Sequence, residues 1–192
     1  MVTVATPLEP QPYCLFDTAI GVCGIAWSAR GLTRLQLPEA NGEATERRLT
    51  ATMARSGVAD PSPEIQPVID ELRRYFAGER VDFQSVALDL ALVSAFHRKV
   101  YDATRAVAWG QTTTYGALAA QTGSPDAARG VGQALGRNPI AVIIPCHRVL
   151  ASGQKSGGFS AFGGVKAKAR LLALEGVDLY GPRDGQLQLP LE

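Results

Sequence analysis

The 192-residue chain is predicted to be an α/β (α+β) protein, in which a small N-terminal sheet-plus-helix domain precedes a mostly helical C-terminal domain with a winged helix-turn-helix-like motif. Three observations lead to this prediction. Runs rich in β-forming residues come first, helical periodicity takes over after residue 93, and the balance of charge changes sign near residue 90. We therefore expect one domain at residues 1–90, a second at 91–180 and a C-terminal tail at 181–192.

The N-terminal domain is expected to consist of short strands and two helices. Residues 12–37 hold three β-rich runs separated by glycine-containing turns, PYCLFDT, GVCGIAWS and GLTRLQLP. Residues 40–62 are polar and alanine-rich, which indicates a surface helix and a loop. Residues 61–80 predict a helix that stops at Gly78 and whose apolar face consists of Ile65, Val68, Ile69, Leu72, Tyr75 and Phe76. Residues 81–91 alternate weakly, which predicts one more strand.

The C-terminal domain begins with a predicted helix that ends at Gly110 and whose inner face consists of Phe96, Val100, Tyr101 and Thr104. A short helix, YGALAA, follows and breaks at Gly123. Ser124-Pro125-Asp126 predicts the start of the next helix, because serine caps free N–H groups, proline suits the first helical position and aspartate suits the positive end of the dipole. This helix is expected to stop at Asn138-Pro139. Two short helices joined by a tight turn resemble a helix-turn-helix.

The surface of the second helix is unusual because one long cation, Arg129, rises among small residues. The small residues are Ala127, Ala128, Gly130, Gly132 and Ala134. Such a helix has few groups that could read base edges in a major groove, but it fits the shallow minor groove, where a wedge can part the bases. The alternative is an exposed arginine that makes a weak surface pair with Asp126.

Basic residues concentrate in the second half of the chain. Residues 91–180 carry ten basic and four acidic side chains, a net charge of +6, whereas the remainder carries nine basic and 14 acidic side chains, a net charge of −5. A basic half is typical of proteins with an anionic partner such as nucleic acid, and the alternative is an ordinary solvated surface.

Composition restricts the class of protein further. The chain is 46% hydrophobic, which is enough for a core, but no apolar run approaches the roughly 20 residues of a membrane span, and no secretory signal is visible. Three cysteines without framework spacing favour free thiols in the cytoplasm. Cys14, Cys23 and the distant His97 do not form a convincing tetrahedral set, so we predict no metal.

The stretch IIPCHRVL at residues 143–150 places a thiol, an imidazole and a fixed charge inside an apolar run. A free thiol has a pKa near about 8.5 and needs a base to become a good nucleophile. His147 could be that base, directly or through one water, with Glu175 to orient it. Because neighbours on a strand point to opposite faces, the backbone must bend here, and Pro145 would help to bend it. The alternative is that Cys146 is a small buried hydrophobe beside a core histidine.

The run PCHRV at residues 145–149 belongs to a longer pattern, which includes Arg137-Asn138-Pro139 and the helix at residues 127–132. This pattern closely resembles the O6-alkylguanine-DNA alkyltransferases, also called methylated-DNA–protein-cysteine methyltransferases. The resemblance spans about residues 92–178 and includes FHRKVYDATRAVAWG, YGALA, GGFSAFGG and LLALEG. The N-terminal 90 residues resemble the family only in outline.

The resemblance implies an enzyme of DNA repair that needs no cofactor. It implies direct, irreversible, single-turnover transfer of the alkyl group from O6-alkylguanine, and from O4-alkylthymine, to a cysteine, with base flipping through the minor groove. The implied partner is double-stranded DNA that contains alkylated guanine, and the protein would act as a cytoplasmic monomer. The product is a thioether that no hydrolysis step restores, so one molecule should perform one transfer.

The resemblance also implies roles for four catalytic residues. Cys146 would accept the alkyl group, and His147 would activate it through a bound water. Glu175 would orient the imidazole. Tyr115 would donate a hydrogen bond to guanine N3 as negative charge builds on the leaving base.

Further residues would contact DNA or line the substrate pocket. Arg129 would enter the base stack and fill the space of the flipped nucleotide, flanked on its helix by the small residues Ala127, Ala128 and Gly132. Asn138 would connect the helix-turn-helix to an active-site strand near the thiol. The Val149 carbonyl would accept from the guanine amine, and Ser160 would belong to the loop that contacts O6.

Two other functions remain open from the sequence. A cysteine hydrolase could use Cys146, His147 and Glu175 as a triad, although it would leave the helix-turn-helix and Arg129 without a purpose. A non-enzymatic module that senses alkylated bases would keep Tyr115 and Arg129 and make the thiol incidental.

Overall fold

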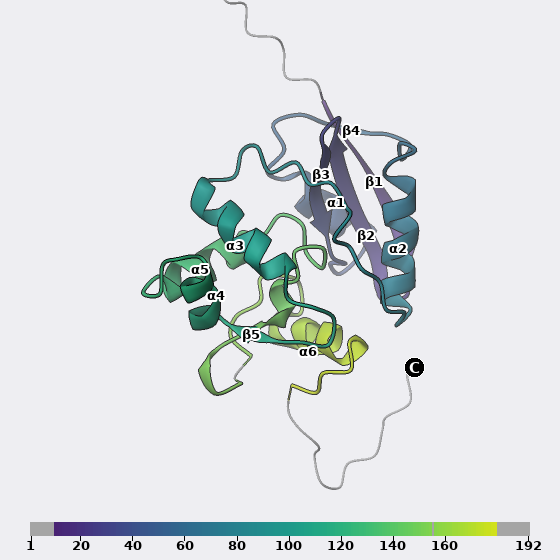
Figure 1. Ribbon diagram of the computed structural model, residues 1–192. Coiled ribbons are helices and arrows are strands. Elements are labelled where there is room, and N and C mark those ends of the chain that lie inside the picture. The colour runs from purple at the N-terminus through teal and green to yellow at the C-terminus, as the bar shows by residue number, and fades with distance from the viewer. Residues whose placement is uncertain (1–9, 155, 180–192) are drawn as a thin grey trace, which may run out of the picture.

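The computed structural model describes residues 10–154 and 156–179, and the predicted tail at 181–192 lies outside them. Figure 1 shows a sheet with its helices at one end of the molecule and a group of helices at the other. This arrangement confirms the predicted fold class. The sheet has the order β3-β2-β1-β4, and its strands are β1 (Gln11–Thr18), β2 (Gly21–Ser28), β3 (Gly31–Gln36) and β4 (Ser56–Val58).

Two helices cover opposite faces of this sheet, because successive strand residues point to opposite sides. On one face, Tyr13 and Ala26 pack with Leu49 of α1 (Gly42–Thr50). On the other face, alternate residues such as Cys14 and Ile25 join the core that includes α2 (Gln66–Phe76). The two N-terminal cysteines are therefore buried strand residues.

The prediction for α2 is confirmed. All six residues of its predicted apolar face are buried, and Gly78 adopts a φ of 91° after the helix ends. Positive φ is accessible to glycine without steric cost, which explains the stop.

The surface helix predicted within residues 40–62 is confirmed as α1, but one prediction in the N-terminal part is wrong and one strand was not predicted. Residues 81–91 do not form a strand of the sheet, since their only described ladder contact is an isolated bridge between Leu32 and Leu88. The fourth strand is instead β4, which pairs parallel to β1 and which the polar composition of residues 40–62 did not indicate. Arg105 holds the 83–86 loop by donating to the carbonyls of Phe83, Gln84 and Val86.

The C-terminal helices are α3 (Ala95–Arg105), α4 (Tyr115–Gln121), α5 (Ala128–Gly136) and α6 (Gly164–Leu174). The first three pack against one another, and α4 and α5 form the helix-turn-helix. A short parallel ladder between β5 (Thr113–Thr114) and β6 (Val149–Leu150) lies beside them. Two short 3₁₀ turns also lie within the described residues, at Cys146–Arg148 and Ser152–Gln154.

Two predicted helix boundaries need correction. Helix α3 ends at Arg105, so Gly110 lies in the following loop, where its φ is 72°. Ser124 does not cap α5, because the chain first makes a turn in which the Ala127 N–H donates to the Ser124 carbonyl, and the helix begins at Ala128. The prediction that Ser124-Pro125-Asp126 starts the helix is therefore wrong, because these residues form the turn that precedes it.

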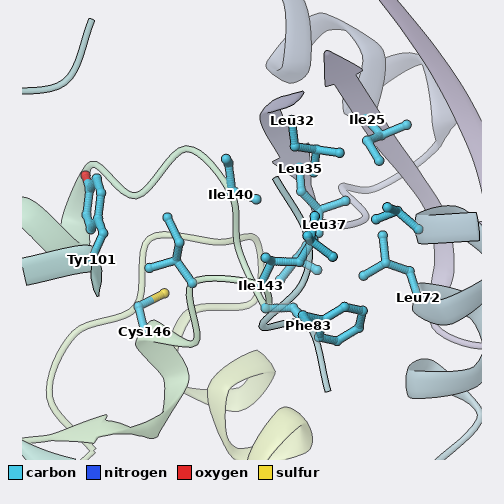
Figure 2. Close-up of a cluster of buried hydrophobic side chains, with 14 of the residues drawn as sticks. Ile25, Leu32, Leu35, Leu37, Leu72, Phe83, Tyr101, Ile140, Ile143 and Cys146 are labelled. Carbon is cyan, nitrogen blue, oxygen red and sulfur yellow. The ribbon is translucent and has the colours of Figure 1, made fainter. Parts of the chain in front are cut away.

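One hydrophobic core connects the two halves of the described chain. Figure 2 shows Leu32, Leu35 and Leu72 of the sheet end facing Ile140 and Ile143, with Cys146 on the side of Ile143 away from the sheet. Leu35 donates its N–H to the Pro139 carbonyl at 2.9 Å, so the segment that leads to Cys146 rests on an edge strand of the sheet. The sheet thus supports the backbone before the thiol.

Replacing Ile140 with alanine should destabilise both halves together. Ile140 is fully buried between them, and deleting such a side chain costs about 2–5 kcal/mol. In urea unfolding we expect tryptophan fluorescence and far-UV circular dichroism to report a single transition at a lower midpoint. The control is Val58→Ala on exposed β4, which should change little. Two separate transitions in the wild-type protein would contradict a shared core.

Candidate active site

The backbone bends sharply before Cys146. The Ile144 N–H donates to the Ile140 carbonyl at 2.9 Å across a tight turn, and within it Val142 has a φ of 70°, a rare conformation for a β-branched residue. Pro145 follows with φ −80° and ψ 64°, and residues Cys146–Arg148 form a 3₁₀ turn. The expected active-site strand is therefore a turn at the thiol, and a turn allows adjacent side chains to serve one site.

Asn138 fixes this turn and contacts the sulfur. Its Nδ2 donates to the Ile144 carbonyl at 2.8 Å and to Cys146 Sγ at 3.3 Å, while its Oδ1 accepts from the Ile140 N–H at 3.0 Å. Burial raises the pKa of the Cys146 thiol, and the Asn138 hydrogen bond opposes that effect only in part. The resting sulfur is therefore protonated, and it needs a base before it can attack.

Behind the thiol, His147 belongs to a buried network centred on Glu175. The carboxylate Oε1 lies 2.8 Å from His147 Nε2, 2.8 Å from the Tyr75 hydroxyl and 2.9 Å from Arg148 Nη2. Its Oε2 accepts from Arg148 Nε at 2.8 Å and from the Gly110 N–H at 3.4 Å. Glu175 is only 4% exposed and caps the C-terminus of α6, so the end of that helix delivers the carboxylate to the imidazole.

The charges and hydrogen bonds of this network determine the protonation states of Glu175 and His147. Burial by itself would raise the pKa of Glu175, but the hydrogen bonds from His147 and Arg148 outweigh it and lower that pKa to about 2. Burial lowers the pKa of His147, and the attraction of Glu175 opposes this shift. The imidazole is therefore neutral at pH 7, and its proton is on Nε2, facing the carboxylate. His147 Nδ1 is buried without a described hydrogen-bond partner, so its lone pair is free.

A cavity of about 620 Å³ opens beside the thiol. Cys146 is 8% exposed and forms part of its wall. Five other residues singled out in the sequence line the same cavity, namely Tyr115, Ala128, Arg129, Gly132 and Ser160. Helix α5, the helix-turn-helix partner of α4, therefore forms one side of the opening and the 156–160 loop forms another.

The loop packs tightly against Tyr115. Gly157 has a φ of 64°, and a Cβ at this position would lie 2.9 Å from the Tyr115 ring and 3.0 Å from its hydroxyl oxygen. Only glycine leaves room for that approach. Burial raises the pKa of Tyr115, so its hydroxyl stays protonated and can donate a hydrogen bond into the cavity.

Three of the residues predicted to contact DNA or line the pocket, Ala127, Asn138 and Val149, are not among those that line the cavity. Ala127 is the residue before α5 and does not line the opening. Val149 is fully buried, and its carbonyl already accepts a hydrogen bond from Lys168 Nζ at 2.6 Å. Burial lowers the pKa of Lys168 to about 8, and the proximity of Cys146 acts in the opposite direction.

The sequence analysis missed three side chains of this site: Tyr75, Arg148 and Lys168. Arg148 stands inside the PCHR motif, and a cation in an apolar run was a signal that it needs a buried anion. Tyr75 was counted only as an apolar helix residue, because the pattern does not reveal where its hydroxyl points. Lys168 lies on a helix rich in small residues and gave no signal of its own.

Residues 10–154 and 156–179 hold no cluster of three or more His, Cys, Asp or Glu residues that could bind a metal ion. The helices of this part of the chain are too short or too polar to cross a membrane.

The chain is similar to proteins of one family along most of its length. The family model described as "6-O-methylguanine DNA methyltransferase, ribonuclease-like domain" matches residues 12–90, and that described as "6-O-methylguanine DNA methyltransferase, DNA binding domain" matches residues 95–177. A methylated-DNA–protein-cysteine methyltransferase of Mycolicibacterium paratuberculosis is 37% identical over 163 residues, which cover 85% of this chain and 91% of the relative.

A relative from another organism and a solved structure agree with this match. A methylated-DNA–protein-cysteine methyltransferase of Methanothermobacter thermautotrophicus is 36% identical over 159 residues, or 82% of this chain and 81% of the relative. The crystal structure of Mycobacterium tuberculosis OGT in complex with DNA superimposes with a TM-score of 0.69 at 37% identity, and covers 85% of this chain and 92% of that one.

Fold and site together define a protein of two linked parts in which a buried cysteine opens toward a helix-turn-helix. The matches make the family specific: the chain belongs to the 6-O-methylguanine DNA methyltransferase family. It is a DNA-repair enzyme that transfers a methyl group from methylated DNA to a protein cysteine.

Replacing Glu175 with glutamine should destabilise the protein and change its response to acid. The substitution leaves the Arg148 charge buried without its anion, which typically costs about 3–5 kcal/mol. In the wild type the folded pKa of Glu175 lies below its ordinary value of 4.5, so its contribution is complete above that pH and is lost as the pH falls toward about 2.

Urea unfolding at several pH values measures both effects. The stability difference between the wild type and Glu175→Gln should be largest above about pH 5 and should shrink on acidification. Glu43→Gln is the control, because the pair between Glu43 and Arg47 is exposed and 3.5 Å long. A difference that stays constant down to pH 2 would show that the carboxylate titrates normally.

Proposed function

We propose that Cys146 is the residue that accepts the alkyl group, and that the substrate is O6-alkylguanine, or O4-alkylthymine, flipped out of double-stranded DNA. One observation carries the proposal: Cys146 and Arg129 line the same cavity, and the network of His147 and Glu175 lies behind the thiol. A monomer with an N-terminal domain at 1–90 and a DNA-binding domain at 91–180, acting in the cytoplasm, suffices for this reaction.

The chemistry follows from the proton assignment. A water molecule between Cys146 Sγ and His147 Nδ1 would carry the thiol proton to the free lone pair of the imidazole. The thiolate then attacks the alkyl carbon: the S–C bond forms, the C–O6 bond breaks, and its electron pair stays on the guanine oxygen. Glu175 stabilises the imidazolium that forms, because its depressed pKa keeps it ionised. The imidazolium gives the thiol proton to the guanine, which makes the proton balance complete, and the guanine stays attached to the DNA as the normal base.

The cavity supplies groups that suit a leaving guanine. The protonated Tyr115 hydroxyl can donate to N3, where negative charge develops as the C–O6 bond breaks. The Val149 carbonyl lies outside the cavity wall and binds Lys168 with one lone pair, so a contact between its second lone pair and the guanine amine requires the wall to move. Ser160 lies on the cavity wall, where its loop can contact O6.

Helix α5 has features that fit the flipping of the damaged nucleotide out of the duplex. Arg129 is exposed near the start of α5, between the small residues Ala128 and Gly130. Flipping a nucleotide costs a few kcal/mol, and a side chain that fills the vacated stack offsets part of that cost. A relative from Mycobacterium tuberculosis has been solved in complex with DNA, which supports a DNA partner here.

Intact-protein mass spectrometry tests the proposal directly. After incubation with a duplex that contains O6-methylguanine, we expect a stable gain of one methyl group per chain, which peptide mapping assigns to Cys146. Cys146→Ala should gain none while it still binds the duplex, and Cys14→Ala is the matched control that should still be methylated. An unchanged wild-type mass would favour a sensor, and continued turnover would favour a hydrolase.

Arg129→Ala should separate flipping from chemistry. We expect a rate at least about tenfold lower with the duplex, but a nearly unchanged rate with free O6-benzylguanine, which needs no flipping. The control is Arg47→Ala, which removes an exposed arginine from α1 at the sheet end. Equal losses on both substrates would remove the assignment of Arg129 to the base stack.

A further inference from the structure

Tyr75 brings the N-terminal part of the chain into the catalytic network. It belongs to α2, is fully buried, and lies 100 positions before Glu175 in the sequence. Its ring packs edge-on against Trp109 with centroids 5.4 Å apart and against Phe76 at 5.2 Å. This packing holds the side chain in one orientation, so its hydroxyl has a fixed position beside the carboxylate.

The hydrogen bonds around this hydroxyl can be assigned completely. Tyr75 has a single O–H proton, and it donates this proton to Glu175 Oε1 at 2.8 Å. Burial, together with the negative charge of Glu175, raises the pKa of Tyr75 well above its ordinary value, so the hydroxyl remains a donor. His147 Nε2 lies 3.3 Å from the same hydroxyl. Because Nε2 carries a proton, it donates mainly to Glu175, and the Tyr75 oxygen accepts a second, weaker hydrogen bond from the same N–H.

We propose that Tyr75 is a positioning residue for alkyl transfer: its hydroxyl holds Glu175 and the His147 ring so that Nδ1 faces the thiol. The inference rests on the proposed roles of Cys146 and His147. Arg148 donates to the Glu175 carboxylate, and so does the Tyr75 hydroxyl, which also lies next to the His147 imidazole. The N-terminal domain thereby contributes a side chain to a site whose other members all come from the second half of the chain.

The direction of the effect follows from the charges around His147. Glu175 attracts its proton, whereas Arg148 and Lys168 repel it and burial disfavours the charged ring. Tyr75 neutralises part of the carboxylate charge by donating to it. Without that hydroxyl, Glu175 would hold the imidazolium more strongly, so the base would become neutral only at a higher pH. Cys146 is adjacent and stays protonated at rest.

The test is the pH profile of single-turnover methyl transfer to Cys146, followed by intact mass with methylated duplex from about pH 5 to 9. Tyr75→Phe keeps the packed ring and removes only the hydroxyl. We expect the acidic limb of its profile to move to higher pH and the plateau rate to fall about fivefold, as for the loss of one buried hydrogen bond.

Tyr13→Phe is the matched control. Tyr13 is also a buried tyrosine of the sheet end that donates to a carboxylate, Glu46 Oε1, at 2.6 Å, but it lies outside the site. We expect a similar loss of stability and an unmoved acidic limb. An unmoved limb in Tyr75→Phe, or an equal shift in Tyr13→Phe, would overturn the inference.

A measurement on the wild type covers the case in which Tyr75→Phe does not fold. Proton NMR should show a Tyr75 hydroxyl protected from exchange and in cross-relaxation contact with the His147 ring, and its absence would also overturn the inference. If the wild type gains no methyl group on Cys146, the proposed function itself fails. If it does gain one and the Tyr75→Phe profile coincides with it, only the positioning role fails.

Discussion

The Glu175 carboxylate is the constraint on which the site depends. It is buried, it stays ionised, and its two oxygens accept hydrogen bonds from His147, Arg148, Tyr75 and the Gly110 backbone. The donors come from three segments, so this side chain at the end of α6 connects α2, the loop after α3 and the turn at the thiol. Because a buried anion is costly without such donors, the folded chain must bring these segments together to keep it charged. The orientation of the imidazole is a consequence of that requirement.

The Cys146 thiol is positioned by contacts that do not involve Glu175. The turn before Cys146 is held by the Asn138 side chain on one side and by the contact of Pro139 with edge strand β3 on the other. The left-handed backbone of Val142 is tolerated because Ile140 and Ile143 anchor both sides of it in the core (Figure 2). The sheet domain therefore acts on the nucleophile through the backbone and on the base through Tyr75, although neither route lies on the cavity wall.

Local signals predicted much of this fold. The strands at residues 12–37 and the apolar face of α2 follow from periodicity and glycine turns, and these predictions are confirmed. Residues 81–91 and β4 were misassigned, since a weak alternation and a three-residue polar strand carry little pattern, and tertiary pairing decides between them. The cooperation of Cys146, His147 and Glu175 was a hypothesis from the chemistry of the residues, and the family resemblance implied the same roles. Tyr75 could not be found, because the position of a hydroxyl at the end of a buried helical side chain depends on how two domains pack.

The main effect of the buried network of Arg148, Glu175 and His147 is to orient the imidazole, and its contribution to the stability of the fold, compared with apolar side chains in its place, is small. Replacing a buried ion pair by apolar side chains of similar volume is often neutral or stabilising, so the pairing of Arg148 with Glu175 adds little to folding that leucine or methionine could not supply. What apolar residues cannot supply is a fixed negative charge beside Nε2. That charge keeps the Nε2 proton in place and leaves Nδ1 as the only basic nitrogen of the ring, and the proposed mechanism requires this nitrogen to receive the thiol proton. A protein that reacts once needs its base already oriented toward the thiol when the substrate binds. The rigid Glu175 carboxylate, with both oxygens hydrogen-bonded, provides that orientation.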